Sequence, residues 1–152
     1  MRLIARKRNE QMLLKSVVCI IPLRANSKGL KNKNILPVCG LPLYMHTVQQ
    51  AIDLQLRTII TTDIPSILQQ NQKLFEVQKR DGSLCGDAVP MCDVIEDVIK
   101  KKNLQENTIV LLQATSPLRE LNDIIKSIRL FESKKFSLVM SCCQADRAGL
   151  KQ

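Results

Sequence analysis

The sequence contains no tryptophan, one tyrosine and three phenylalanines, so aromatic residues make up only 3% of its 152 positions. Proteins that bind single-stranded nucleic acid commonly stack bases on aromatic side chains, and this chain offers few of them. No apolar run approaches the roughly 20 residues of a membrane-spanning helix. The N-terminus also lacks the apolar stretch and small-residue cleavage site of a signal peptide. We therefore expect a cytoplasmic protein with no membrane partner.

Histidine occurs once, at His46, and none of the six cysteines belongs to a C-x-x-C pair. Zinc sites draw on closely spaced Cys and His ligands, and disulfide frameworks are typical of short secreted domains. Cys19 and Cys142 lie in apolar runs, where a free cysteine packs as a small hydrophobic residue. The sequence predicts reduced thiols and no zinc centre.

Apolar residues make up 45% of the chain and the net charge is +9. The apolar fraction predicts a packed core of Ile, Leu and Val. The net charge is compatible with a solvated basic surface, a nucleic acid or a small polyanion as partner. Because aromatic residues are so few, a phosphate-bearing nucleotide is favoured over nucleic acid. Basic residues are concentrated at two places: Arg2, Arg6, Lys7, Arg8 and Lys15 near the N-terminus, and Lys28, Lys31 and Lys33 in one short segment.

Strand-like and helix-like segments alternate along the sequence. Short apolar or β-branched runs predict strands at 17–23, 57–63, 75–78, 108–113 and 136–141. Apolar residues at helical spacing predict helices at 42–53, 64–73, 87–102 and 120–133. This alternation predicts an α/β fold with a mostly parallel sheet. Ligands of such sheets bind at the carboxyl ends of the strands, where the loops 24–34 and 114–119 lie.

The loop 24–34 combines one arginine, three lysines and one glycine with several amide and hydroxyl donors. A triphosphate needs such a set, because cations oppose its charge and N–H groups satisfy its oxygens. The loop has neither the Walker A pattern nor G-x-G-x-x-G. From the residues alone, phosphate binding and a merely solvated basic loop are equally acceptable interpretations.

Two motifs resemble those of the cytidylyltransferases that activate sialic acids. IIPLRANSKGLKNKNILPVCGLPL at 20–43 resembles their N-terminal signature, and LLQATSPLR at 111–119 differs from their LLQPTSPLR at one residue. TTD at 61–63 is similar to their STD. The resemblance spans roughly 17–151. It implies a Rossmann-like three-layer sandwich of the nucleotide-diphospho-sugar transferase type, incomplete at the C-terminus, occupying 17–152 after a basic extension at 1–16. Translation could start at Met1 or Met12.

The resemblance implies that the anomeric hydroxyl of a nine-carbon acid sugar attacks the α-phosphate of CTP, giving a CMP-sugar and pyrophosphate. Catalysis would then depend on positioning and on neutralising phosphate charge, with Arg24 and Lys33 as the catalytic residues. The nucleotide-binding residues it implies are Arg24, Asn26, Ser27, Lys28, Lys33, Asn34 and Arg80. The sugar-binding residues it implies are Gln113, Thr115, Ser116 and Lys151.

The resemblance also implies Mg²⁺ as cofactor, bound by two aspartates in a segment beyond residue 152, so that no metal ligand is expected in this chain. The homodimer region of the family would lie in that same later segment. Met91 departs from the family, because many members have a small hydroxyl residue there.

Several alternatives stay open. The chain could be a catalytically inactive, truncated remnant that still binds nucleotide, or, less favoured, a basic nucleic-acid-binding module. Asp63 is expected to cap the following helix, and Ser116-Pro117 could simply form a turn. Sialic, legionaminic and pseudaminic acids are equally compatible with these loops.

Overall fold

The computed structural model describes residues 14–25, 29–70 and 74–142. The chain divides into two compact units, Met1–Leu118 and Arg119–Gln152, which are treated separately below. In the described part of the chain, no helix is long and apolar enough to cross a membrane.

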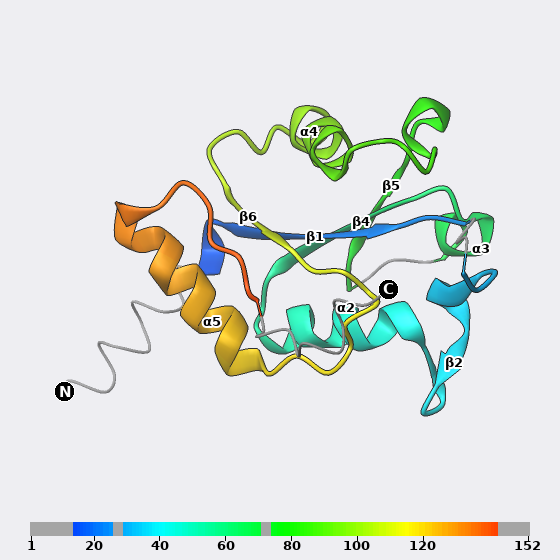
Figure 1. Ribbon diagram of the computed structural model, residues 1–152, viewed down its shortest axis with the longest axis horizontal. Helices are drawn as coiled ribbons and strands as arrows, with labels where there is room; N and C mark the ends of the chain where they lie inside the picture. The colour runs from blue at the N-terminus through cyan, green and yellow to red at the C-terminus, as the bar shows by residue number, and fades with distance from the viewer. Residues whose placement is uncertain (1–13, 26–28, 71–73, 143–152) are drawn as a thin grey trace, which may run out of the picture. The chain divides into compact units, whose positions relative to one another are not determined.

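A four-stranded sheet forms the centre of the first unit (Figure 1). Its order is β5-β4-β1-β6, and every neighbouring pair is parallel, as the alternating pattern predicts. The strands are β1 (Val17–Leu23), β4 (Arg57–Thr62), β5 (Glu76–Lys79) and β6 (Thr108–Leu111). The expected bounds of β1 are confirmed, and the other three strands differ from their expected bounds by one or two residues at an end.

Strand β1 is central because it pairs on both sides. Ile20 lies opposite Ile59 of β4 and Leu111 of β6. Residues on both of its faces are buried, which a continuous apolar run permits and an alternating one would not. Val18 and Ile20 pack with Ile59 and with two residues of the α4 region, Val98 and Leu104.

Helices cover the two faces of this sheet, α2 (Leu43–Asp53) on one and α4 (Met91–Lys102) on the other (Figure 1). The predicted helix at 42–53 is confirmed. The predicted start of α4 at residue 87 is wrong, because Pro90 has an extended backbone with ψ of 141° and the helix begins after it. The helix expected at 64–73 is represented by the short α3 (Pro65–Leu68), and residues 71–73 lie outside the described part.

A small hairpin, which the sequence did not predict, precedes α2. It consists of β2 (Pro37–Val38) and β3 (Leu41–Pro42). The two residues between them, Cys39 and Gly40, have φ of 48° and 83°, the left-handed pair that a tight two-residue hairpin requires. His46 Nε2 lies 2.8 Å from Val38 O and ties the hairpin to the helix, which gives His46 a structural role.

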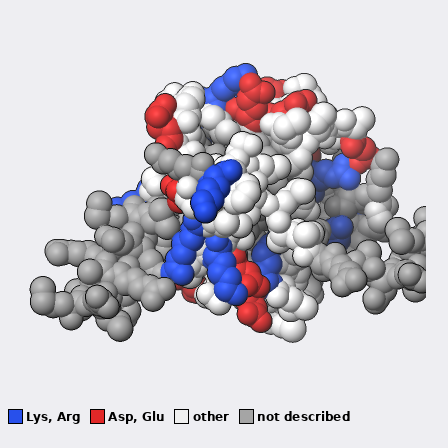
Figure 2. Space-filling view, turned by 60° about the vertical axis from the view of Figure 1, so that its left-hand side comes forward, with Lys and Arg blue, Asp and Glu red and all other residues white. Residues whose placement is uncertain are grey.

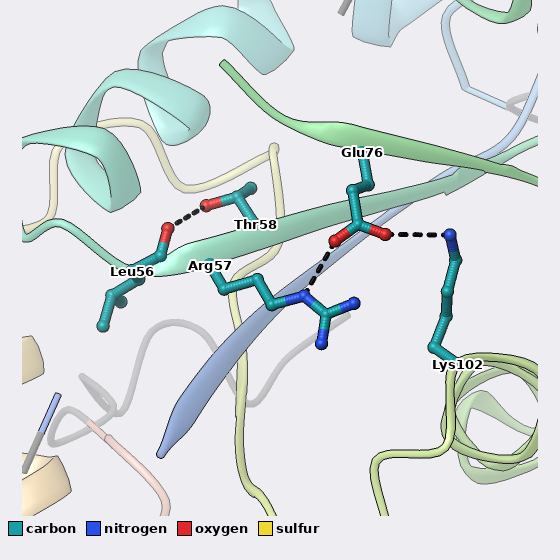
Figure 3. A network of polar contacts seen from close by, with 5 residues as sticks. All are labelled: Leu56, Arg57, Thr58, Glu76 and Lys102. Carbon is teal, nitrogen blue, oxygen red and sulfur yellow. Dashed lines mark hydrogen bonds and ion pairs between the residues drawn. The ribbon is translucent and has the colours of Figure 1, made fainter. Parts of the chain in front are cut away.

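Edge strand β5 is anchored by a network of charges around Glu76 (Figure 3). Arg57 on β4 donates from Nε to Glu76 Oε1 at 2.7 Å, and Lys102 at the end of α4 donates from Nζ to Oε2 at 2.9 Å. One carboxylate therefore links two strands and a helix.

The second unit contains α5 (Leu121–Leu130), which continues into a π-helical turn, η3 (Phe131–Lys135). The strand predicted at 136–141 is wrong, since this segment pairs with no strand within the described residues. Phe136, Leu138 and Met140 are all more than half exposed. β-Propensity reflects how well a side chain fits a paired, half-buried surface, so a short run of apolar residues does not form a strand without a partner.

Five cysteines lie in the described residues and all are free thiols: Cys19, Cys39, Cys85, Cys92 and Cys142. Cys19 is fully buried in β1, as its apolar neighbours predict.

Candidate functional site

A cavity of about 280 Å³ lies at the carboxyl edge of the sheet, within the first unit. Its walls come from the ends of β1, β5 and β6, the first loop and the start of α4. The lining residues are Pro22, Arg24, Gly29, Lys33, Asn34, Arg80, Met91, Gln113, Ala114 and Thr115. The two loops that the sequence singles out, after β1 and after β6, therefore contribute to one cavity.

Six of the predicted site residues line this cavity: Arg24, Lys33, Asn34, Arg80, Gln113 and Thr115. Ser116 is exposed and is not among the lining residues; its N–H donates to Gln113 O at 3.2 Å, as in a turn. The remaining four, Asn26, Ser27, Lys28 and Lys151, lie outside the described residues. Their assignments stay predictions.

The first loop returns to the sheet through a short 3-10 turn, η1 (Lys33–Ile35). Asn32 enters it in the left-handed conformation, with φ of 57°, which asparagine tolerates better than most residues. Asn34 is buried, and its Nδ2 donates to Arg24 O at 3.2 Å. Asn34 thus fixes the turn against the end of β1, and this places the half-buried Lys33 at the cavity wall.

Two carboxylates hold the segment that follows β1. Arg24 forms an ion pair through Nη1 with Asp87, which lies between η2 (Gly82–Leu84) and α4. The N–H of Ala25 donates to Asp63 Oδ1 at 2.7 Å. The expectation that Asp63 caps α3 is wrong: the N-cap is Ile64, without a side-chain cap, and the Asp63 carboxylate is used by the neighbouring loop instead.

Arg80 is the most deeply buried charged residue of the cavity wall, with 5% of its surface exposed. Its Nη2 donates to Thr61 O at 3.0 Å, but its Nε has no hydrogen-bond partner among the described residues. Burial lowers the pKa of Arg80, Asp63 opposes that effect, and nearby Arg24 adds to it. A buried N–H without a partner is costly, and such groups in a cavity are candidates for ligand contact.

Cys85 lies close to this cation. Burial raises the pKa of its thiol, the negative charge of Asp63 raises it further, and Arg80 lowers it. Its Sγ donates to Asp81 O at 3.2 Å. Because the thiolate is the reactive form, the raised pKa disfavours Cys85 as a nucleophile.

The loop after β6 is tied to the rest of the unit by α2. Gln50 on that helix donates from Nε2 to Pro117 O at 2.8 Å. This contact holds the segment in which Gln113, Ala114 and Thr115 reach the cavity. No group of three or more His, Cys, Asp or Glu side chains that could hold a metal ion occurs among the residues that the structure describes.

Sequence reasoning missed one feature of the site, the Arg24–Asp87 pair, and misjudged a second, the role of Asp63. Arg24 and Asp87 are 63 residues apart, and no local pattern links them. The sequence indicates Met91 only as a departure from the family that the chain resembles. It lines the cavity with an apolar side chain that is 40% exposed.

An open parallel sheet with cationic side chains gathered beyond its strand ends defines a class of α/β proteins that bind phosphate-bearing ligands at this edge. Comparison with known proteins identifies the family within this class. The chain belongs to the cytidylyltransferase family, whose family model matches residues 18–147.

The chain is about 30% identical to several curated relatives over the residues that align. It is 28% identical to the N-acylneuraminate cytidylyltransferase of Escherichia coli over 137 residues, which are 86% of this chain and 32% of the relative. It is 30% identical to the enzyme of that name from Streptococcus agalactiae, covering 86% and 32%. It is also 30% identical to the post-translational flagellin modification protein B of Campylobacter coli, covering 78% and 54%. The chain thus spans about a third of the length of the first two relatives.

Solved structures support the fold. A CMP:2-keto-3-deoxy-manno-octonic acid synthetase complexed with CTP superposes with a TM-score of 0.65 at 21% identity, over 77% of this chain and 47% of that one. A cytidylyltransferase from Leptospira borgpetersenii gives a TM-score of 0.58 at 18% identity, over 80% and 50%. The Rossmann-like fold expected from the sequence is confirmed.

Proposed function

We propose that this chain forms the nucleotide-binding part of an enzyme that transfers CMP from CTP to a sialic-type nine-carbon acid sugar and releases pyrophosphate. One observation carries the proposal: the buried Arg80, with its unpartnered Nε, lines the same cavity as Arg24 and Lys33. The names of the curated relatives support the choice of substrates. A cytoplasmic location follows from the proposal, because CTP is a cytoplasmic metabolite.

The proposed roles follow from where each side chain lies. Arg24 and Lys33 stand on the first loop, where they can neutralise the phosphates of CTP as charge builds on the leaving pyrophosphate. Asn26, Ser27 and Lys28 are proposed to add donors from the same loop. Arg80 is proposed to donate its free N–H to the cytosine edge, which has carbonyl and ring-nitrogen acceptors.

Asn34 is proposed to contact the ribose, with its carbonyl oxygen, since its Nδ2 already donates to Arg24 O. Gln113 and Thr115, on the loop after β6, are proposed to orient the acid sugar so that its anomeric hydroxyl faces the α-phosphate. Ser116 and Lys151 are proposed to assist in sugar binding.

Divalent metals are generally used by this family, and we propose Mg²⁺ as the cofactor of the complete enzyme. The described residues do not fit a metal site of their own, since they contain no suitable cluster of carboxylates. We therefore assign no catalytic step of this chain to the metal. The homodimer expected for the family is likewise a proposal for the complete enzyme.

Calorimetric titration with CTP tests the nucleotide site. We expect CTP to bind the wild type, and Lys33→Ala to weaken binding about tenfold or more through loss of a charged hydrogen bond. Lys31→Ala is the matched control, because Lys31 is exposed in the same loop and does not line the cavity. Equal affinity of wild type and Lys33→Ala for CTP would remove the phosphate role of Lys33. Titrations with and without Mg²⁺ measure how far the metal contributes.

Pyrophosphate release in the presence of CTP, Mg²⁺ and N-acetylneuraminate tests the transfer reaction. Release would establish that the chain is an active enzyme. Binding of CTP without release with sialic, legionaminic or pseudaminic acid would support the alternative of a chain that retains only nucleotide binding.

The charge distribution of the described residues does not favour a nucleic-acid partner. In the view of Figure 2, basic side chains lie beside acidic ones and do not form an uninterrupted basic surface. Arg57, Lys100, Lys101, Lys102 and Lys126 are all paired with carboxylates. Cations that are already paired have less to gain from phosphates.

A further inference from the structure

The ion pair between Arg24 and Asp87 involves a residue that the proposed chemistry has not used. Arg24 lines the cavity, whereas Asp87 is not among the lining residues. Both side chains are partly exposed, 31% for Arg24 and 38% for Asp87. The pair therefore lies at the rim of the cavity and connects the end of β1 to the segment before α4.

We propose that Asp87 is a positioning residue that holds Arg24 in the ligand-free protein and gives it up to the phosphates when nucleotide binds. The inference rests on the proposed function, since it concerns the same cavity. It adds a residue that acts through Arg24, because Asp87 pairs with Arg24 and is not among the residues that line the cavity.

The charges of the cavity give the reason for such a counter-ion. Arg24 lies near enough to Arg80 to affect its charge state, and Lys33 lines the same space. Three cations that converge on a small volume repel one another when no anion is bound. Asp87 neutralises one of them from the rim, and Asp63 partly balances Arg80 from the other side.

A bound phosphate changes the preferred partner of Arg24. The guanidinium of arginine presents several N–H groups in a fixed fork that suits two oxygens of one anion. While Nη1 is paired with Asp87, that fork is partly occupied. The phosphate must therefore displace Asp87 from Arg24. Breaking this ion pair reduces the net binding free energy of the phosphate.

The displacement is easy, because partly exposed ion pairs are weak. The same carboxylate can take Arg24 back when the phosphates leave. Asp87 thus lowers the affinity of the cavity for any polyphosphate by a few-fold and keeps Arg24 oriented between binding events.

The test is titration of the full chain with inorganic tripolyphosphate and, in parallel, with CTP. We expect Asp87→Asn and Asp87→Ser to bind tripolyphosphate about two- to fivefold more tightly than wild type, from the strength of an exposed pair. Asp87→Glu, which can restore the pair, should return to within twofold of the wild-type affinity. In an Arg24→Gln background, Asp87→Asn should give no gain.

A merely structural role for Asp87 predicts the opposite sign, because a distorted cavity would bind more weakly. Thermal unfolding of each variant shows whether it is folded. The Nε–H signal of Arg24 in a ¹H–¹⁵N spectrum gives a second measurement. It should shift in the wild type when tripolyphosphate is added, and it should already be shifted in ligand-free Asp87→Asn. Unchanged or weaker binding by folded Asp87→Asn, or an Arg24 signal indifferent to Asp87, would overturn the proposal.

The outcomes separate this proposal from the proposed function. If CTP binds with dependence on Lys33 but Asp87→Asn brings no gain, only the role of Asp87 fails. If tripolyphosphate binds more tightly to Asp87→Asn but CTP binds no better than tripolyphosphate, the counter-ion role stands and the nucleotide site fails. If neither ligand binds any variant, both are overturned.

Discussion

Asp63 Oδ1 accepts a hydrogen bond of 2.7 Å from the N–H of Ala25, which joins the end of β4 to the first residue after Arg24. Adjacent parallel strands bring these two positions together at one edge of the sheet. The negative charge of Asp63 also raises the pKa of buried Arg80, against the lowering that burial causes. One carboxylate therefore supports two cations of the cavity without lining it.

Asp63→Ala should weaken CTP binding about tenfold, because it frees the start of the first loop and removes a charge that balances Arg80; loss of a hydrogen bond to a charged group costs about 1.5–3 kcal/mol. Asp63→Asn keeps an acceptor for Ala25 and should lose less. Asp53→Ala is the control, since exposed Asp53 contacts only the neighbouring turn of α2 through Gln49. Calorimetry on the three variants measures the difference. A CTP affinity of Asp63→Ala equal to that of Asp53→Ala would contradict the supporting role.

Arg80→Met should reduce the affinity for CTP without reducing the thermal stability of the chain. Replacing a buried cation by an apolar side chain of similar length is often neutral or stabilising, and Arg80 leaves its Nε unpaired. We expect thermal unfolding of Arg80→Met at or above the wild-type temperature, with CTP affinity reduced tenfold or more. Arg80→Lys keeps the charge without the planar fork and should also bind CTP weakly. An unfolding temperature of Arg80→Met far below that of wild type would show that Arg80 mainly stabilises the fold.

Ile20→Ala should destabilise the chain by about 2–5 kcal/mol, the usual range for a large aliphatic residue in a core. Ile20 is fully buried in the central strand and packs against Ile59 and Val98. Leu118→Ala removes a leucine side chain that is 94% exposed and should change stability by less than about 0.5 kcal/mol. Urea unfolding followed by circular dichroism gives both values. Similar losses for the two variants would contradict the assigned core.

Glu76→Gln should alter how stability depends on pH. The hydrogen bond from Arg57 is the largest cause that lowers the pKa of Glu76; burial opposes it and Lys102 adds to it. A carboxyl whose pKa is lower in the folded state stabilises the fold above its unfolded pKa, near 4.5, and loses that contribution as pH falls through the folded value.

Because these side chains are partly exposed, we expect a loss below about 1 kcal/mol for Glu76→Gln at pH 7. The difference from wild type should shrink steadily below pH 4.5 and be smallest at the most acidic pH. Unfolding titrations of both proteins from pH 7 to pH 3 measure it, and a difference that stays constant over this range would exclude the ion pairs as its source. Ser133→Ala is a control that should show no such pH dependence, because it removes an exposed hydrogen bond of 2.7 Å from Ser133 Oγ to the backbone O of Leu130, and neither group titrates in this range.

Much of the sheet was predictable because a strand that is buried on both faces has a continuous run of apolar residues. The run at 17–23 is continuously apolar, and its bounds as β1 are confirmed. The convergence of the loops after β1 and β6 followed from a topological rule, since parallel strands end at the same edge. Arg24, Lys33 and Gln113 line one cavity for that reason.

The parts that sequence reasoning missed depend on distant partners. The segment 136–141 is rich in apolar residues, as a strand would be, but no described strand pairs with it. The pairing of Arg24 with Asp87 and that of Ala25 with Asp63 require the finished fold to bring the residues together. The start of α4 depended on whether Pro90 stands inside the helix or before it, and both are compatible with the local pattern.

The central position of β1 has a consequence for synthesis on the ribosome. Val17 pairs with Thr108, so the first strand to emerge must wait for a neighbour that is made about ninety residues later. At a translation rate of roughly 5–20 residues per second, that interval is about 5 to 18 seconds. During this time the edge of β1 that pairs with β6 is unprotected in the nascent chain, so this apolar strand is exposed to aggregation until β6 has been made.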